Sequence, residues 1–386
     1  MRVTMLVRCL AMMRGGGETR HLAWARELTA LGHDVRVITG VPLVSGTARY
    51  PIDGSDVDTI RSPYAREFVY RFQNRRGFGR MTMTALHLDE ELFCRAAWRR
   101  IAARRPQPDI VHAHALHQAA RLKTVDVPVV INLPGAPNAR YVDDLRQADA
   151  LVADGWAAAH LPETLGRSIE RVPKGVDSER FTPDGKSLRD TLRLGRRSVI
   201  LTVARLVPIK NVRLLLDAVA IVRERVDAVH LVIVGDGPQA EALRHYAAAL
   251  DMLDAVTFAG SVPHADTPAF YRAADVFALS SDFDNSPNVV LEAMACGLPV
   301  VTTDVGGVRE FVAEGAGGLV VPPNDAAGLA AALRTYLASP ISARSAGAFN
   351  RSRAITEFSW RASALRLLDV YDHVRSARAG VTRATA

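Results

Sequence analysis

Residues 198–235 read SVILTVARLVPIKNVRLLLDAVAIVRERVDAVHLVIVG, in which an apolar run, an amphipathic segment and a second apolar run follow one another. The amphipathic segment repeats its apolar positions at helical spacing, and the two runs are short and continuously apolar, as in strands covered on both faces. Four more such runs, VTFAG, DVFALS, PVVTT and GLVVP, alternate with helical patterns along the second half. The pattern predicts a parallel, doubly wound α/β sheet.

The first half shows the same rhythm less regularly. Its candidate strands are RVTMLV, DVRVITG, DIVHAHA, VPVVIN, DALVADG and IERVP, and ETRHLAWARELTALG is the predicted first helix. A chain of 386 residues exceeds what one core usually organises, so two domains are expected. The stretch RVPKGVDSERFTPDG, residues 171–185, has the proline and glycine punctuation of a linker.

We therefore predict two Rossmann-like domains, an N-terminal one over residues 1–178 and a C-terminal one over 179–358. The last amphipathic segment, residues 359–380, is expected to cross back to the N-terminal domain. Ligands of such sheets bind at the carboxyl ends of the strands. The expected ligand site is therefore a deep cleft between the two domains.

Composition narrows the class of protein. Hydrophobic residues make up 48% of the chain and charged residues 23%, which indicates a globular protein with a packed core. Cys9, Cys94 and Cys296 lie far apart without the spacing of a zinc site or a disulfide framework, as expected for a cytoplasmic protein. Arg8 interrupts the first apolar run, which favours a strand over a signal peptide, and no apolar run approaches the ~20 residues that span a bilayer.

The net charge of +7 is concentrated in one region. Residues 61–105 contain eleven arginines and four acidic residues, interleaved with Tyr64, Phe68, Tyr70, Phe72 and Phe78. Two interpretations stay open: a solvated helix face, or a surface for an anionic acceptor or for anionic lipid at the inner face of the membrane. The region lacks a recognisable nucleic-acid-binding module, so nucleic acid is not an expected partner.

The stretch SSDFDNSPNVVLEAMACGLPVVTTD, residues 280–304, predicts a helix with Ser286 as N-cap and Pro287 in its first turn. The backbone amides of the first turn are then available to anions and hydroxyl oxygens. Asp284 before the helix and Glu292 inside it supply two separated carboxylates, which suit different hydroxyl pairs of a polyhydroxylated ligand. The expected contacts are Asp284, Pro287, Asn288, Val289, Val290 and Glu292.

Two other loops carry candidate phosphate contacts. Arg205 and Lys210 follow the first strand of the second half, where two cations can hold a diphosphate and stabilise the charge of a leaving group without a metal. Gly15, Gly16 and Gly17 let the backbone approach a phosphate or sugar after the first strand of the chain. Gly235, in VGDGP, is a weaker candidate because such glycines more often serve a turn.

Taken together, these motifs resemble the retaining glycosyltransferases of the GT-B fold, family 4 type. The resemblance covers nearly the whole chain and rests on GGGETRHLAWARELTALGHDV, RVPKGVDSERF, ARLVPIKNVRLLLDA, VGDGP and DNSPNVVLEAMACGLPVVTTDVGGVRE. It implies that the second half binds a nucleotide-sugar donor and the first half an acceptor. It also implies a retaining transfer to an acceptor hydroxyl that needs neither a cofactor nor a metal.

The resemblance gives individual residues expected roles. Arg205 and Lys210 hold the diphosphate, Glu292 the ribose diol, and Asp284 with the helix start the donor sugar. Gly16 lies against the phosphate or the transferred sugar. Val262, in AGSVPH, approaches the base of the nucleotide, and UDP is expected ahead of GDP as that nucleotide. The expected acceptor contacts are Glu18, His112, His114, Asn132 and Lys174.

The sequence departs from the family pattern at three positions. Asp284 stands where the family has Glu, Lys174 where it has Asn, and Pro134 where many members have a histidine near the transferred sugar. The first change shortens the reach of the carboxylate by one methylene. The last leaves open whether His112, His114 or Asn132 replaces the missing histidine.

The residues are also compatible with other kinds of site and function. His112, His114 and His117 mimic a hydrolase metal site but lack further ligands, so His112 and His114 are expected either to face the acceptor or to be partly buried strand histidines. The Asp56/Asp58 and Asp282/Asp284 strings mimic a metal-dependent transferase motif. A nucleotide-sugar epimerase or hydrolase, or a non-catalytic two-lobed sugar-binding protein, is the alternative function. The expected acceptor is a small molecule or a lipid-linked glycan. These motifs do not specify which acceptor is used, nor the donor sugar or the oligomeric state.

Overall fold

The structure is a computed structural model that describes residues 1–12, 16–43, 56–63, 79–226 and 228–384. Its contacts divide the chain into two compact units. The N-terminal unit comprises Met1–Pro173 and Ser363–Ala386, and the C-terminal unit comprises Lys174–Ala362. The break after Pro173 falls within the predicted linker stretch.

The N-terminal unit is built on a seven-stranded parallel sheet with the order β3-β2-β1-β4-β5-β6-β7. The strands are β1 (Arg2–Leu6), β2 (Asp34–Pro42), β3 (Asp56–Ser62), β4 (Ile110–His114), β5 (Val129–Leu133), β6 (Ala150–Ala153) and β7 (Glu170–Arg171). The helices are α1 (Gly16–Ala30), α3 (Gly79–Ala103), η1 (Ala139–Tyr141), α4 (Val142–Arg146), α5 (Gly155–Leu165) and α13 (Trp360–Ala384).

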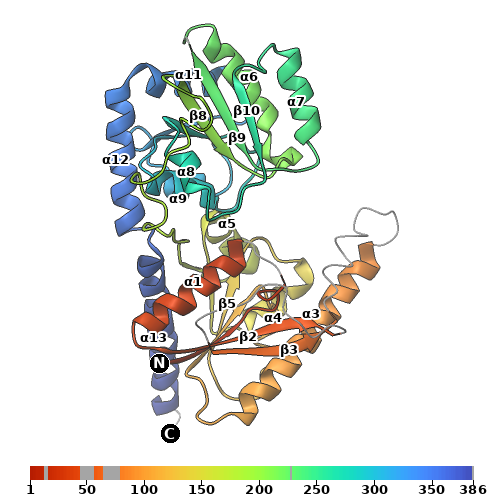
Figure 1. The fold of residues 1–386 in the computed structure, drawn as a ribbon. Coiled ribbons are helices and arrows are strands. Elements are labelled where there is room, and N and C mark those ends of the chain that lie inside the picture. The colour runs from red at the N-terminus through yellow and green to blue at the C-terminus, as the bar shows by residue number, and fades with distance from the viewer. Residues whose placement is uncertain (13–15, 44–55, 64–78, 227, 385–386) are drawn as a thin grey trace. The chain divides into compact units, whose positions relative to one another are not determined.

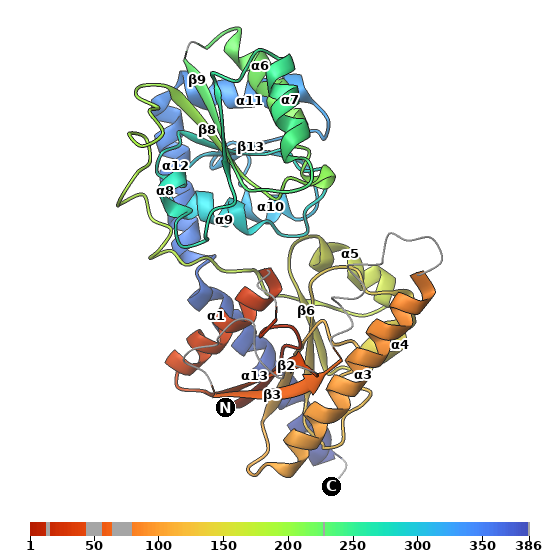
Figure 2. The same cartoon turned by 45° about the vertical axis from the view of Figure 1, so that its right-hand side comes forward.

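The long C-terminal helix α13 belongs mostly to the N-terminal unit, as predicted. It packs beside α1, where the indole of Trp24 donates to the hydroxyl of Ser363 at 2.8 Å. Both views show α1 and α13 together on one side of the sheet and α3 on the other (Figures 1 and 2). Arg378 near its end bonds the carboxylates of Asp126 and Asp149, which fixes the helix along the sheet.

The C-terminal unit has a six-stranded parallel sheet with the order β10-β9-β8-β11-β12-β13. The strands are β8 (Ser198–Val203), β9 (Val229–Val234), β10 (Val256–Gly260), β11 (Val276–Leu279), β12 (Val300–Thr303) and β13 (Gly318–Val321). The helices are η2 (Pro208–Lys210), α6 (Val212–Arg223), α7 (Ala240–Ala249), α8 (Pro268–Tyr271), α9 (Asn288–Ala295), α10 (Val308–Phe311), α11 (Ala326–Ala338) and α12 (Pro340–Thr356).

Alternate residues of the strands in the C-terminal unit face two separate cores. Ile200 of β8 packs with α6 and α11 on one face, whereas its neighbours Val199 and Leu201 pack with α9 on the other. Because both faces are covered, the strands are continuously apolar, which is why their positions were predictable from the sequence. The predicted α/β class with two Rossmann-like sheets is confirmed.

Several elements differ from the prediction. The edge strand β3 was not predicted because polar residues occupy it, and its Asp56 and Asp58 pair with Arg36 and Arg100. These ion pairs explain the Asp56/Asp58 string without a metal. Helices α8 and α10 span only four residues each, shorter than their apolar patterns suggested.

The sequence predicted that the chain has no membrane-spanning segment and that its arginine-rich region could contact a membrane. None of the helices in the described ranges has the length and apolar character needed to cross a membrane. The aromatic part of the arginine-rich region, from Tyr64 to Phe78, lies outside the described residues, and the same holds for Gly15. The proposed membrane contact therefore stays a prediction.

Candidate functional site

The strand order places two loops of the C-terminal unit at a topological switch point. Strands β8 and β11 are neighbours at the centre of the sheet, and the chain leaves them toward opposite sides. Loops diverging from such a pair form the usual ligand crevice of an open α/β sheet. The loop after β8 carries Arg205 and Lys210, and the loop after β11 carries Asp284.

The loop after β8 is fixed by the loop after β9. The amide of Leu206 donates to the carbonyl of Asp236 at 2.9 Å. Gly235 and Gly237 have φ of +132° and +159°, and a Cβ on Gly235 would lie 1.9 Å from the carbonyl oxygen of Ala204. Gly235 therefore has a packing requirement that is independent of any ligand, and the packed loop leaves the side chain of Arg205 exposed.

The loop after β11 is fastened to the short helix η2. The hydroxyl of Ser280 donates to the carbonyl of Asn211 at 2.9 Å, and the amide of Asp282 donates to the carbonyl of Ile209 at 2.9 Å. The side-chain amide of Asn211 in turn donates to Asp282 at 2.8 Å. These bonds bring Lys210 and the start of the Asp284 loop to the same place.

Lys210 and Asp284 form an ion pair. Their side chains retain 15% and 17% of their exposure, so the pair is shielded but can still be reached from solvent. The ammonium group has three donor hydrogens, and the carboxylate cannot accept all of them. A bound anion can therefore join this pair without displacing it.

The backbone at Gly306 and Gly307, in the loop between β12 and α10, packs against the carbonyl group of Asp284. The amide of Gly307 donates to the carbonyl of Asp284 at 3.0 Å. Gly306 has φ of +57°, and a Cβ there would lie 1.6 Å from the same carbonyl oxygen. Only glycine fits this close approach, so Gly306 is a positioning residue. It lies in the motif DNSPNVVLEAMACGLPVVTTDVGGVRE, but the sequence did not predict it as a site residue.

Helix α9 begins one residue later than predicted. Pro287, not Ser286, occupies the N-cap position, and the helix starts at Asn288. The prediction that the amide of Val290 is available to a ligand is wrong, because this amide donates to the carbonyl of Pro287 at 3.2 Å. The amides of Asn288 and Val289 precede the first intrahelical bonds.

Two polar atoms are buried at this helix start without a partner among the described residues. They are the hydroxyl oxygen of Ser286 and the side-chain carbonyl oxygen of Asn288. Buried polar atoms are almost always bonded in folded proteins, so unpaired ones mark places where a ligand or ordered water completes the structure. Lys174, a predicted acceptor contact, donates to the carbonyl of Ser286 at 2.7 Å and thereby supports the helix start in the C-terminal unit.

Glu292 lies in α9 with only 7% of its surface exposed. The hydroxyl of Tyr271 donates to one carboxylate oxygen at 2.8 Å, and Nε2 of His264 lies 2.9 Å from the other. The bond to Glu292 raises the pKa of His264, and burial followed by the charge of Glu292 raises the pKa of Tyr271 well above 10. The two partners fix the orientation of the carboxylate, and His264 belongs to the same loop as the half-buried Val262.

In the N-terminal unit, the glycine turn meets the ends of β4 and β5. A Cβ on Gly17 would lie 2.3 Å from Nε2 of His114, so the imidazole occupies the space that a side chain would need. Nδ1 of His114 lies 3.0 Å from the side-chain oxygen of Asn132. Gly16 and Gly17 begin helix α1 beside His114. Two other predicted acceptor contacts, Glu18 and Asn132, are buried, with 6% and 1% of their surface exposed.

His112 is not available to an acceptor, so the predicted acceptor contact is wrong and the alternative, a buried strand histidine, holds. It is fully buried, and the hydroxyl of Tyr371 in α13 lies 2.8 Å from its Nδ1. Burial, with the nearby charges of His114 and Arg20, lowers its pKa to about 3, so the imidazole is neutral. The alternation of β4 predicted one face for His112 and His114 correctly, but α13 covers the first of them.

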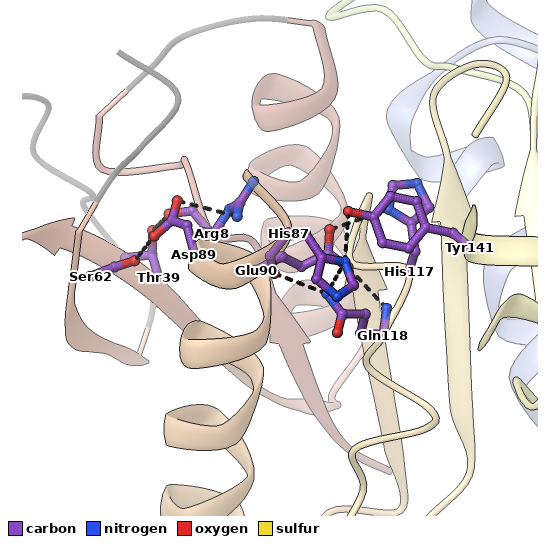
Figure 3. Close-up of polar contacts among 9 residues, drawn as sticks. All are labelled: Arg8, Thr39, Ser62, His87, Asp89, Glu90, His117, Gln118 and Tyr141. Atoms are coloured by element: carbon purple, nitrogen blue, oxygen red, sulfur yellow. Dashed lines mark hydrogen bonds and ion pairs between the residues drawn. The ribbon is translucent and has the colours of Figure 1, made fainter. Parts of the chain in front are cut away.

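A second polar cluster lies in the same unit between α3, the turn after β4 and η1 (Figure 3). The ring of Tyr141 is stacked between His87 and His117, with centroid distances of 5.5 and 4.5 Å. Nδ1 of His117 lies 3.3 Å from the carboxylate of Glu90, which also accepts from the amide of Gln118 at 2.9 Å. Beside this cluster, Asp89 binds Arg8 and Ser62 (Figure 3).

The cluster explains His117 without a metal. Its imidazole is engaged by Glu90 and Tyr141, whereas His112 contacts Tyr371. Over the described ranges, no group of three or more His, Cys, Asp or Glu side chains is arranged to hold a metal ion.

Comparison with known families gives these sites a context. Residues 186–353 match the family described as glycosyl transferases group 1, and residues 15–172 match the glycosyl transferase 4-like domain. The chain belongs to the GT-B glycosyltransferases of the family 4 type. The two matches together cover most of both units, and the first includes the whole Lys210, Asp284 and Glu292 group.

This glycosyltransferase is similar to curated proteins over part of their length. It is 36% identical over 221 residues to a GDP-mannose-dependent α-(1-6)-phosphatidylinositol monomannoside mannosyltransferase of Mycolicibacterium smegmatis, which covers 55% of this chain and 58% of that protein. It is 35% identical over 266 residues to a D-inositol 3-phosphate glycosyltransferase of Geodermatophilus obscurus, covering 63% and 58%. The chain thus spans less than two thirds of the length of these relatives.

Solved structures share the fold over nearly the whole chain. A sucrose-phosphate synthase from Thermosynechococcus elongatus has a TM-score of 0.76 at 22% identity, covering 97% of this chain and 99% of that one. Anabaena HepE in complex with UDP has a TM-score of 0.73 at 18% identity, covering 97% and 100%. At these identities the likeness establishes the GT-B fold.

Proposed function

We propose that the protein transfers a sugar from a nucleoside-diphosphate sugar to an acceptor hydroxyl, with retention of the anomeric configuration. The observation that carries the proposal is the Lys210–Asp284 ion pair at the carboxyl edge of β8 and β11, beside the start of α9. Family membership supports the reaction class.

The donor site is assembled in the C-terminal unit. Lys210 and the exposed Arg205 hold the diphosphate, whose charge grows as the bond to the sugar breaks. Asp284, with the amides of Asn288 and Val289, binds sugar hydroxyls. The unpaired oxygens of Ser286 and Asn288 support a ligand at this helix start, because each lacks a donor among the described residues.

Glu292 binds the ribose diol of the nucleotide. A carboxylate held by Tyr271 and His264 cannot rotate freely, yet each of its oxygens keeps a lone pair for a further hydroxyl. The loop with Val262 and His264 contacts the base in this proposal, because His264 is bonded to the carboxylate that binds the ribose.

The chemical step needs no nucleophile from the protein. The bond between the anomeric carbon and the phosphate oxygen breaks, and the acceptor oxygen forms its bond to the same carbon on the same face. The departing phosphate oxygen takes the acceptor proton, and Lys210 compensates the remaining negative charge. The cations replace a metal in this scheme.

The acceptor belongs to the N-terminal unit in this proposal. Gly17 and His114 lie at the carboxyl edge of its sheet, and both inositol-directed relatives support an acceptor that carries an inositol phosphate, free or lipid-linked. The mannosyltransferase relative supports GDP as the nucleotide, against the expectation of UDP from the sequence. A cytoplasmic protein that meets a lipid-linked acceptor at the inner membrane face fits this scheme.

A product assay tests the proposal. The full chain is incubated with UDP- or GDP-linked hexoses and with inositol 3-phosphate or phosphatidylinositol, and the anomeric configuration of any product is read by NMR. A product with the donor's configuration supports the proposal. Free sugar or an epimer without acceptor would instead identify a hydrolase or an epimerase, and an inverted product would refute retention.

A further inference from the structure

A cavity of about 420 Å³ opens at the amino edge of the sheet in the C-terminal unit. Its lining includes Ser198, which begins β8, Asp275, which directly precedes β11, and Pro299, which directly precedes β12. The donor-site residues follow the carboxyl ends of β8 and β11. The cavity and the donor site therefore lie at opposite edges of the same sheet and cannot share a ligand.

The lining of this cavity is strongly cationic. Five arginines contribute to it, and Asp275 is its single carboxylate. Asp275 is already paired with one of them, Arg189. The arginines are Arg189, Arg196, Arg197, Arg272 and Arg344.

Two of the arginines are held in place by backbone carbonyls. Nε of Arg272 donates to the carbonyl of Thr182 at 2.8 Å, and Nη1 of Arg197 donates to the carbonyl of Asp254 at 3.2 Å. Carbonyl partners orient a guanidinium without neutralising it, unlike a carboxylate. The positive charge at the cavity is therefore fixed in position before any ligand arrives, which lowers the entropy lost on binding.

Arg196 and Arg344 add two further cations to the lining of the cavity. Arg196 lies in the loop before β8 and Arg344 in the first turns of α12, and both are exposed. The planar guanidinium group matches the geometry of phosphate oxygens. Leu298 and Leu337 add an apolar wall, which suits a ligand that also has a less polar part.

We propose that this cavity binds a phosphate ester, namely a phosphate or diphosphate group carried by a small molecule or by a lipid headgroup. The excess of arginines over carboxylates selects an anion, and the volume lies within the range of small-molecule sites. The inference is independent of the glycosyl transfer proposed above, because it uses none of the donor-site residues.

The test uses the full chain with Lys210→Ala as background, which weakens the binding of pyrophosphate at the donor site. Arg196→Gln/Arg344→Gln removes two cavity charges, and Arg225→Gln/Arg361→Gln removes two charges of exposed arginines elsewhere in the C-terminal unit. Calorimetric titration with pyrophosphate is expected to show a dissociation constant at least about tenfold higher in the cavity variant, which corresponds to about 1.4 kcal/mol. The control variant should titrate like its parent.

A second arm separates the two sources of phosphate. Co-sedimentation is measured with phosphatidylcholine vesicles that do or do not contain phosphatidylinositol. Loss of sedimentation in the cavity variant alone identifies a lipid headgroup, whereas weakened pyrophosphate binding with unchanged sedimentation identifies a free ester. If neither pyrophosphate nor vesicles distinguish the cavity variant from the control, the proposal is overturned, and the single variants serve as the test should the double variant fail to fold.

Discussion

Lys210 and Asp284, 74 residues apart in the sequence, form an ion pair at the point where β8 and β11 diverge. The pair depends on a series of bonds between the η2 segment and the loop after β11, and Gly306 supports it from a third loop. An arrangement fixed by three loops is preorganised, so a diphosphate can be bound without rebuilding the site.

Lys210→Ala is expected to lower turnover at least a hundredfold, about 3 kcal/mol in activation free energy, because the leaving diphosphate loses a fixed cation. Lys186→Ala, which removes an exposed lysine of the same unit, is the matched control. Turnover is measured at saturating donor. Near-normal turnover of the Lys210 variant would refute its assignment.

Gly306→Ala should damage both stability and activity, because the new Cβ would meet the carbonyl of Asp284 at 1.6 Å. Gly195→Ala provides a matched control, since Gly195 has nearly the same φ, +54°, but open space around it. Both variants carry the backbone strain of about 1 kcal/mol, and only the first carries the clash. Equal thermal midpoints and equal turnover for the two variants would show that the loop does not position Asp284.

Tyr271→Phe tests how Glu292 is oriented. The variant removes one hydrogen bond to the carboxylate and is expected to raise the donor KM by roughly tenfold, about 1 to 1.5 kcal/mol, with little change in kcat. Tyr246→Phe, whose hydroxyl bonds Asp217 away from the switch point, is the control. A fall in kcat without a change in KM would place Glu292 in the chemical step instead of in nucleotide binding.

Stability of the N-terminal unit should fall as the pH drops below about 6.5. Burial lowers the pKa of His112 to about 3 and that of His21 well below its usual value of 6.5, so the unfolded chain binds more protons than the folded one in this range. Each histidine contributes up to about 1.4 kcal/mol per pH unit. Between pH 7.5 and 4.5, His112→Gln should flatten this dependence, whereas exchange of the exposed His160 for Gln should not.

Denaturant titrations followed by tryptophan fluorescence report mainly on this unit, because three of the four tryptophans, Trp24, Trp98 and Trp156, lie in it. A free energy of unfolding that is constant from pH 7.5 to 4.5 in the parent protein would contradict the burial of the neutral imidazoles.

The alternation of strands and helices was predictable because covered strands must be apolar on both faces, as Val199 and Ile200 show. Strand β3 was missed because an edge strand tolerates charges such as Asp56, which Arg36 neutralises. Helix α13 was predictable from the helical spacing of its apolar residues. The helix is long enough for most of it to pack in the N-terminal unit.

The candidate site was predictable as a set of residues but not as a set of contacts. Lys210, Asp284 and Glu292 stand in motifs, whereas their partners come from distant loops: His264 and Tyr271 for Glu292, and Gly306 for Asp284. For His112 the sequence left contact with the acceptor and burial both open, and a tyrosine 259 residues away decides for burial. Local patterns do not encode which element of the chain covers a strand end.

The most direct test of the account is a crystal structure of the full chain with a bound nucleoside diphosphate. The account predicts that diphosphate oxygens lie about 3 Å from Nζ of Lys210 and from the guanidinium of Arg205, with the ribose hydroxyls on Glu292. A diphosphate bound elsewhere, with Arg205 and Lys210 turned to solvent, would contradict it.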